Sequence, residues 1–81
     1  MVCKMPSLVA YMLLVTDTGK EYDVLEAVRS IAGITELRTV YGEYDVFIRI
    51  EVTDLVLMDE IVTRIRRVPG VVQTTTLVAS P

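Results

Sequence analysis

Histidine is absent from this chain of 81 residues, and so is tryptophan. Without histidine the sequence lacks the commonest general base and metal ligand of proteins. Its single cysteine, Cys3, cannot form an internal disulfide, which fits a reducing cytoplasm. The sequence also lacks a Cys-x-x-Cys pair, an acidic calcium loop, a glycine-rich phosphate loop and a nucleophile beside a base. We therefore expect no catalytic residue, no metal site, no cofactor and a cytoplasmic location.

Positive charge and long apolar runs are also scarce. Eight Lys and Arg residues stand against 11 Asp and Glu residues, and the net charge of −3 argues against nucleic-acid binding through phosphate neutralisation. The basic cluster Arg64, Arg66 and Arg67 falls in the last turn of an expected helix, where it complements the helix dipole. No apolar run reaches the roughly 18–20 residues of a transmembrane helix, and the N-terminus lacks a signal-peptide pattern. We expect neither direct nucleic-acid contact nor membrane association.

A 37-residue internal repeat organises the chain. The shift superposes Val15-Thr16-Asp17 on Val52-Thr53-Asp54, Arg29 on Arg66, Gly33 on Gly70, and Thr39 on Thr76. Each unit reads as a β-type run, an amphipathic helix that ends in glycine, and a second β-type run. The doubled pattern predicts an α+β, ferredoxin-like βαββαβ sandwich, with a four-stranded antiparallel sheet in the order 4-1-3-2 and two helices on one face. We expect one domain over residues 1–81, with its core in residues 8–79.

The first unit opens with residues 8–16, an apolar run that predicts a central strand covered on both faces. Thr18 and Glu21 match a capping box that would start the first helix, and Gly33 would end it. The expected apolar side of this helix comprises Val24, Leu25, Val28, Ile31 and Ala32. Residues 34–41 predict an edge strand, on which Glu36 and Arg38 discourage edge-to-edge pairing.

The second unit follows a tight turn or bulge at Gly42-Glu43. In the strand 46–52 we expect one set of side chains to face the helices, namely Val46, Ile48, Ile50 and Val52, and the opposite face to hold Phe47, Arg49 and Glu51. Asp54 would cap the second helix and Pro69-Gly70 would end it. The expected apolar stripe of this helix comprises Leu55, Met58, Ile61, Val62, Ile65 and Val68. Residues 71–79 would complete the sheet.

The sheet face away from the helices is expected to be apolar in part. The side chains that we expect to find there are Met12, Leu14, Leu37, Phe47, Val72 and Val78. Such a patch exceeds what an isolated monomer normally exposes, and 52% of the residues are apolar. The sequence therefore predicts back-to-back packing of sheets into at least a dimer.

Polar chemistry gathers in residues 39–45, where a short loop carries carboxylates, two phenols and a glycine. A carboxylate there could hold the α-ammonium group of a zwitterion, while backbone N–H groups or hydroxyls hold its carboxylate. The alternative interpretation is a β-turn whose Asp45 bonds to the local backbone. Both interpretations stay open on the residues alone.

Residues 39–46 and 69–78 together resemble the effector-binding domain of the Lrp/AsnC transcription regulators, also called the regulation-of-amino-acid-metabolism (RAM) domain. The hallmarks of that domain are a Gly-x-Tyr-Asp hairpin, an acidic residue that opens the second helix, and a Gly-Val followed by Thr-x-Thr. The residues that match in order are Gly42, Tyr44, Asp45, Asp54, Gly70, Val71, Thr74 and Thr76. The resemblance extends from about residue 8 to residue 79.

This resemblance implies a homo-oligomer, either a sheet-packed dimer or a higher ring such as an octamer. It also implies that a small effector, usually an amino acid, binds between dimers. The implied effector-binding residues are Tyr41, Gly42, Glu43, Tyr44, Asp45, Thr74 and Thr76. Only about seven residues precede the first expected strand, too few for the family's helix-turn-helix. The resemblance therefore implies a stand-alone domain that does not bind DNA directly, and a full-length Lrp/AsnC regulator is an expected partner.

The leading hypothesis is an intracellular amino-acid sensor that acts in transcriptional regulation of amino-acid metabolism and is not an enzyme. Three alternatives remain. One is an ACT-like regulatory domain, and another is a purely structural assembly module. The third is a small dimeric ferredoxin-like enzyme with a buried carboxylate such as Asp45 as its base. An interfacial polar pocket would favour the sensor, and a closed apolar cavity would favour the enzyme.

Overall fold

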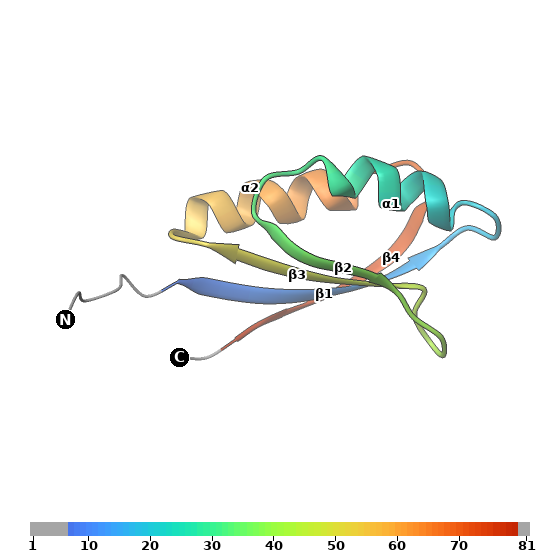
Figure 1. The fold of residues 1–81 in the computed structure, drawn as a ribbon, viewed down its shortest axis with the longest axis horizontal. Helices are drawn as coiled ribbons and strands as arrows, with labels where there is room; N and C mark the ends of the chain where they lie inside the picture. Colours follow the sequence, from blue (N-terminus) through green and yellow to red (C-terminus); the bar gives the residue numbers. More distant parts are fainter. Residues whose placement is uncertain (1–6, 80–81) are drawn as a thin grey trace.

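The computed structural model describes residues 7–79, which form one sheet covered on one face by two helices (Figure 1). The elements follow in the order β1 (Leu8–Thr16), α1 (Glu21–Arg29), β2 (Ile34–Thr39), β3 (Val46–Val52), α2 (Leu55–Arg66) and β4 (Val71–Val78). The strand order is β2-β3-β1-β4, and all neighbouring strands are antiparallel. The predicted ferredoxin-like fold and its strand order are confirmed. Within the described residues, neither helix is long and apolar enough to cross a membrane.

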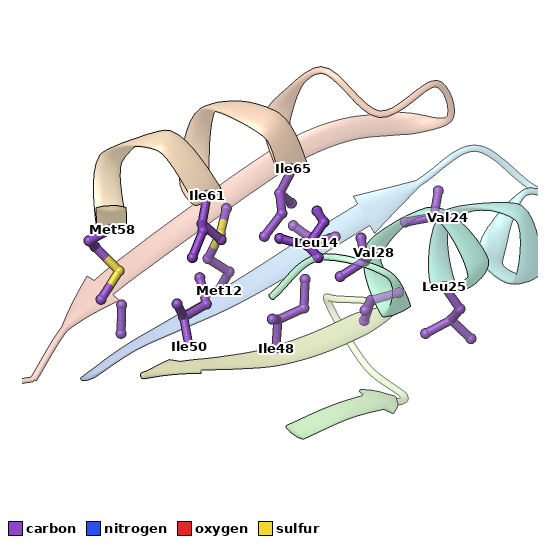
Figure 2. Packing of buried hydrophobic residues seen from close by; sticks show 13 residues of the cluster. Met12, Leu14, Val24, Leu25, Val28, Ile48, Ile50, Met58, Ile61 and Ile65 are labelled. Carbon is purple, nitrogen blue, oxygen red and sulfur yellow. The ribbon is translucent and has the colours of Figure 1, made fainter. Parts of the chain in front are cut away.

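The core lies between the sheet and the two helices (Figure 2). Alternate residues of β1 and β3 point toward the helices, and the central ones are fully buried. The sheet contributes Ala10, Met12, Leu14, Val46, Ile48 and Ile50, and the helices contribute Val24, Leu25, Val28, Met58, Ile61 and Ile65. The predicted division of β3 between its two faces is thus confirmed.

The prediction for the open face of the sheet is wrong in most of its residues. Met12 and Leu37 both lie opposite the buried Ile48 in the strand register, and directly paired residues point to the same face. Leu14 lies opposite Val46, and Val78 lies opposite Ala10, so these side chains also face the helices. The open face instead carries Val9, Tyr11, Leu13, Val15, Phe47, Thr75 and Leu77. Of the six predicted side chains, the register places Phe47 there.

The two helices begin differently. Asp54 caps α2 as predicted, because its Oδ1 accepts a hydrogen bond from the Leu57 N–H at 2.8 Å. The predicted capping box at Thr18 is wrong: α1 begins at Glu21, its N-cap is Lys20, and no side chain caps it. A turn precedes this helix instead, in which the Lys20 N–H donates to the Asp17 carbonyl at 2.9 Å.

Some predicted boundaries and apolar positions also differ from the structure. The first helix ends at Arg29, four residues before Gly33, and the second strand ends at Thr39. Leu55 and Ala32 were expected on the apolar sides of their helices, but both are exposed. These differences leave the order of elements unchanged.

The equivalent glycines of the two repeats lie close to the helix of the other repeat. Gly33 has φ +100°, and a Cβ atom there would lie 2.7 Å from Ile61 Cδ1 on α2 and 3.1 Å from Val52 Cγ1. Gly70 has φ +99°, and a Cβ atom there would lie 3.2 Å from Val24 Cγ2 on α1. Both positions therefore require glycine for backbone conformation and for close packing.

We expect Gly33→Ala to lower the free energy of unfolding by about 2–4 kcal/mol, because it combines a left-handed backbone cost with overpacking. Gly19→Ala is the matched control: φ is +82°, but a Cβ atom there has no neighbour within 4 Å. Gly19→Ala should lower the free energy of unfolding only by the cost of the left-handed backbone, about 1–2 kcal/mol. Urea unfolding of both variants measures the difference, and equal losses would show that the contact with Ile61 is unimportant.

We expect Asp54→Ala to destabilise the domain by about 1 kcal/mol, since it removes the cap of α2. Thr18→Ala should change stability by less than about 0.5 kcal/mol, because it is an exposed surface substitution that removes no cap. Thermal unfolding of the two variants side by side checks this. If Thr18→Ala lowered the stability as much as Asp54→Ala, Thr18 would cap α1 after all.

Candidate functional site

The loop between β2 and β3 projects from one end of the sheet (Figure 1). It is closed by a hydrogen bond from the Val40 N–H to the Asp45 carbonyl at 2.9 Å. Tyr41 at its tip is fully exposed, with a relative accessibility of 104%. Gly42 and Glu43 are also exposed, and a Cβ atom at Gly42 would meet nothing within 4 Å. The tip therefore offers a phenol, a carboxylate and an open backbone to solvent.

Asp45 joins this loop to the central strand. Its Oδ2 accepts a hydrogen bond from the Thr16 backbone N–H at 2.8 Å and another from the Thr16 hydroxyl at 3.3 Å. Its own N–H donates to the Leu14 carbonyl at 2.8 Å. The pairing of β1 with β3 ends at Leu14 and Val46, so the carboxylate replaces a strand partner for Thr16. Asp45 thus holds the loop against a residue that is itself buried.

Tyr44 ties the same loop to the opposite edge of the sheet. Its phenol oxygen lies 3.1 Å from Thr75 Oγ1 on β4, within hydrogen-bond distance. Because β1 lies between β3 and β4, this contact reaches across the central strand. The side chains of Tyr44 and Asp45 therefore fix the base of the loop at two points and leave its tip exposed.

Thr74 and Thr76 lie elsewhere in the same subunit. Thr74 is opposite the buried Leu14 and Thr76 is opposite the buried Met12, so both point to the helix side of the sheet. Thr76 lines an apolar groove of about 550 Å³ between β4 and α2. The structure brings Tyr41, Gly42, Glu43, Tyr44 and Asp45 together in one loop, but it does not bring the two threonines to that loop within one subunit.

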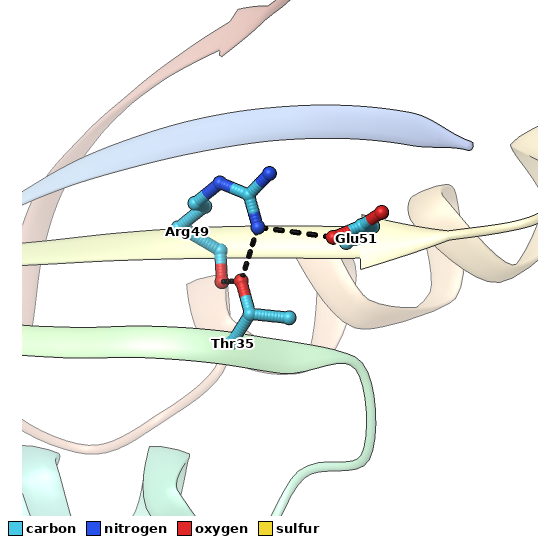
Figure 3. A network of polar contacts seen from close by, with 3 residues as sticks. All are labelled: Thr35, Arg49 and Glu51. Atoms are coloured by element: carbon cyan, nitrogen blue, oxygen red, sulfur yellow. Dashed lines mark hydrogen bonds and ion pairs between the residues drawn. The ribbon is translucent and has the colours of Figure 1, made fainter. Parts of the chain in front are cut away.

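The open face of the sheet carries a polar network beside aromatic rings. Arg49 Nη1 donates to Thr35 Oγ1 at 2.8 Å and to Glu51 Oε1 at 3.0 Å (Figure 3). The hydrogen bond to Glu51, followed by one to Tyr11, raises the pKa of the Arg49 guanidinium. Tyr11 stacks on Phe47, with ring centroids 5.9 Å apart. The central charge on this face is therefore neutralised within the subunit.

Thr16 and Thr75 hold the candidate loop in place, although the sequence-based prediction did not include them. For Thr75 a signal was available: strand alternation puts it on the opposite face from Thr74 and Thr76. For Thr16 the sequence gave no such signal. Its partner is Asp45 because the pairing of β1 with β3 ends at Leu14 and Val46, just before Thr16. In the described part of the chain, no three Cys, Asp or Glu side chains converge to hold a metal ion.

Solved structures with this fold include two of similar size to this chain. The hypothetical protein PHS023 from Pyrococcus horikoshii is 35% identical, with a TM-score of 0.84, over 91% of this chain and 90% of that one. FFRP-DM1 is also 35% identical, with a TM-score of 0.85, over 90% of this chain and 99% of that one.

The AsnC protein of E. coli shares the fold at 16% identity, with a TM-score of 0.80. The match covers 89% of this chain but 50% of AsnC. No protein among the curated sequences matches the chain. Residues 9–80 match the Lrp/AsnC ligand binding domain. Because this match spans nearly the whole sequence, the chain belongs to the Lrp/AsnC ligand-binding domain family.

Proposed function

We propose that this chain is a cytoplasmic amino-acid sensor that self-assembles and acts in transcriptional regulation without binding DNA itself. Membership of the Lrp/AsnC ligand-binding family supports a small-molecule effector. All described elements, from Leu8 to Val78, belong to this one domain, and the net charge of −3 does not favour contact with DNA. Its regulatory output would pass through assembly with further copies or with a full-length Lrp/AsnC regulator.

The observation that carries this proposal is the anchored loop with an exposed tip. Asp45 and Tyr44 are committed to Thr16 and Thr75, so the tip is held in place without being covered. Glu43 is exposed and suits the α-ammonium group of an amino acid, while the backbone around Gly42 suits its carboxylate. In this proposal Asp45 positions the loop and Glu43 contacts the effector.

Within one subunit, the side chains of Thr74 and Thr76 lie on the helix side of the sheet, away from the loop. An effector site that used both the loop and these threonines would therefore span two subunits. A ligand that binds between subunits stabilises the assembled state over the separate one. This arrangement would make assembly depend on effector concentration. It would therefore account for sensing without any catalytic step.

We further propose that the open face of the sheet forms the dimer contact. Its apolar side chains include Tyr11, Leu13, Phe47 and Leu77, of which Leu77 is 55% exposed. The pairing of Arg49 with Glu51 lowers the cost of burying the charges there. Packing two such faces together would cover the apolar surface.

An enzymatic role with Asp45 as general base is a weaker proposal. Both hydrogen bonds that Thr16 donates go to the same carboxylate oxygen, so this oxygen is already engaged in holding the loop against β1. The groove of about 550 Å³ beside Thr76 is open to solvent on the helix side, away from this carboxylate. A purely structural assembly module remains the alternative that experiment must separate from the sensor.

Thermal unfolding at fixed protein concentration against each standard amino acid tests the sensor. A ligand at 100 times its dissociation constant should stabilise the folded state by about 2.7 kcal/mol. We expect one or a few amino acids to raise the unfolding temperature. If none of them does so at millimolar concentration, the chain is an assembly module and the effector proposal fails.

Three variants locate the effector contact. Glu43→Gln should abolish the ligand-induced shift without changing the unliganded unfolding temperature, because Glu43 is exposed. Asp45→Asn should lower the unliganded stability by about 1–3 kcal/mol through its weakened bonds to Thr16. Glu60→Gln, an exposed change of the same kind on α2, should leave both quantities unchanged. A ligand shift that survives Glu43→Gln would remove that side chain from the site.

The dimer contact predicts that Leu77→Glu reduces self-association, because it places a charge in the apolar face. Tyr22→Glu, on a residue of α1 that is 78% exposed, is the control. Sedimentation velocity at micromolar concentration should show smaller species for the first variant only. Unchanged sedimentation of Leu77→Glu would argue that the open face is not the contact.

A further inference from the structure

One flank of α2, the side that faces β4, carries four residues at spacings of four, three and four. These residues are Leu55, Asp59, Val62 and Arg66, which we call the β4-side flank. The first three line the groove of about 550 Å³ together with Thr76 and Val78. Arg66 lines a second groove of about 300 Å³ with residues 71–74 of β4. This spacing is the one by which a helix presents a continuous seam to another helix.

The two charges of this flank have no ion-pair partner among residues 7–79. Four basic side chains in that part of the chain do pair with carboxylates, namely Lys20, Arg29, Arg38 and Arg49. Arg64, Arg66 and Arg67 do not, and neither does Asp59. Asp59 and Arg66 are seven residues apart, about 10 Å along the helix. The flank therefore has a negative and a positive position, each uncompensated within the described chain.

The start of the same flank is apolar and exposed. Leu55 is 66% exposed, its neighbour Val56 is 69% exposed, and Val78 across the groove is 56% exposed. α2 already buries Met58, Ile61 and Ile65 against the sheet, so these additional apolar residues are not needed for the core. They remain available to a surface that covers the groove.

We propose that α2 of one copy packs along the β4-side flank of α2 in a second copy, with the two helices antiparallel. In the register that places Asp59 opposite Arg66 of the second copy, the symmetry-related pair forms as well. The two-fold axis then passes between positions 62 and 63, so that Val62 packs near it, while Leu55 lies opposite position 70, in the turn that follows α2 of the second copy. A parallel pairing would instead place Asp59 against Asp59 and Arg66 against Arg66. The antiparallel arrangement also aligns the helix dipoles favourably.

The occupant of the flank is a second copy because the flank is complementary to itself when reversed. The strand beside it does not oppose this approach: β4 carries no charged residue, whereas the other edge strand, β2, carries Glu36 and Arg38. Charged residues on an edge discourage association, and their absence leaves it open. A partner of different sequence would need complementary charges of its own, whereas a second copy already carries them as Asp59 and Arg66.

This contact lies on the helix side of the sheet, so it is distinct from the open face. A subunit with two different two-fold contacts joins dimers into larger assemblies with an even number of copies. The inference extends the proposed self-assembly but does not depend on effector binding. It gives the assembly a second surface that can be tested separately.

Charge reversal tests the contact. Asp59→Arg and Arg66→Asp should each remove the largest species seen in sedimentation velocity, since each one places like charges opposite each other at both symmetry-related positions. An equimolar mixture of the two variants should restore that species, because every reversed position then meets an opposite charge. The double variant Asp59→Arg/Arg66→Asp should restore it as well.

Controls use the opposite flank of α2, where Leu57, Glu60 and Arg64 line a different groove with Gly33 and Val52. Glu60→Arg and Arg64→Asp change the same charges there and should leave the assembly unchanged. Thermal unfolding of every variant checks that it folds. The proposal is overturned if the unaltered chain stays monomeric at 100 μM, if either single reversal assembles normally, or if the mixture fails to recover the larger species.

A background variant separates this contact from the other proposals. With Leu77→Glu present, the open-face contact is weakened, and any remaining dimer should disappear on adding Asp59→Arg. Persistence of that dimer would overturn the α2 contact. The shift in unfolding temperature caused by amino acids is measured on the same variants, so failure of the effector proposal is seen independently.

Discussion

In addition to the strand pairing, two close contacts set how the halves of this fold pack: Gly33 lies against Ile61 of α2, and Gly70 lies against Val24 of α1. Both glycines and both contacting residues are 37 positions apart, which is the period of the sequence repeat. In each βαβ unit, the glycine between the helix and the second strand therefore packs against the helix of the other unit in the same way. Because a Cβ atom at either glycine would push that helix away, the positions of both helices over β1 and β3 depend on these contacts. The fully buried core follows from that placement.

The candidate loop depends on the same framework through Asp45. The central strand extends beyond its pairing with β3, and the carboxylate accepts the Thr16 N–H that is left there. A buried N–H without a partner would be costly, so the residue that the resemblance assigned to an effector also stabilises the fold. This dual position explains why the two interpretations of Asp45 could not be separated on composition. The exposed Glu43 has no such structural role and is better suited to contact a ligand.

Much of the fold could be predicted because the repeat, the helix periodicity and the Asp54 cap are local signals. The faces of β1 could not be assigned, since LVAYMLLVT is apolar at nearly every position and alternation then carries no information. Met12 and Leu14 were misplaced for that reason, and only the register with β3 settles their side. The capping box failed because its residues lie in a turn that includes Gly19. In the candidate site, Thr74 and Thr76 follow the family pattern, but the contact to Tyr44 comes from Thr75.

The basic end of α2 has two possible explanations, and the structure makes them distinguishable. Complementing the helix dipole requires positive charge in the last turn but is indifferent to the side on which it lies. Association requires it on a particular flank, in line with an acidic and an apolar position. Arg66 meets that condition with Asp59 and Val62, while Arg64 lies on the other flank beside Leu57 and Glu60. If the dipole were the whole explanation, reversing Arg64 and reversing Arg66 would have the same consequence. A difference between them in assembly, at equal stability, would support the proposal that a second copy recognises one flank.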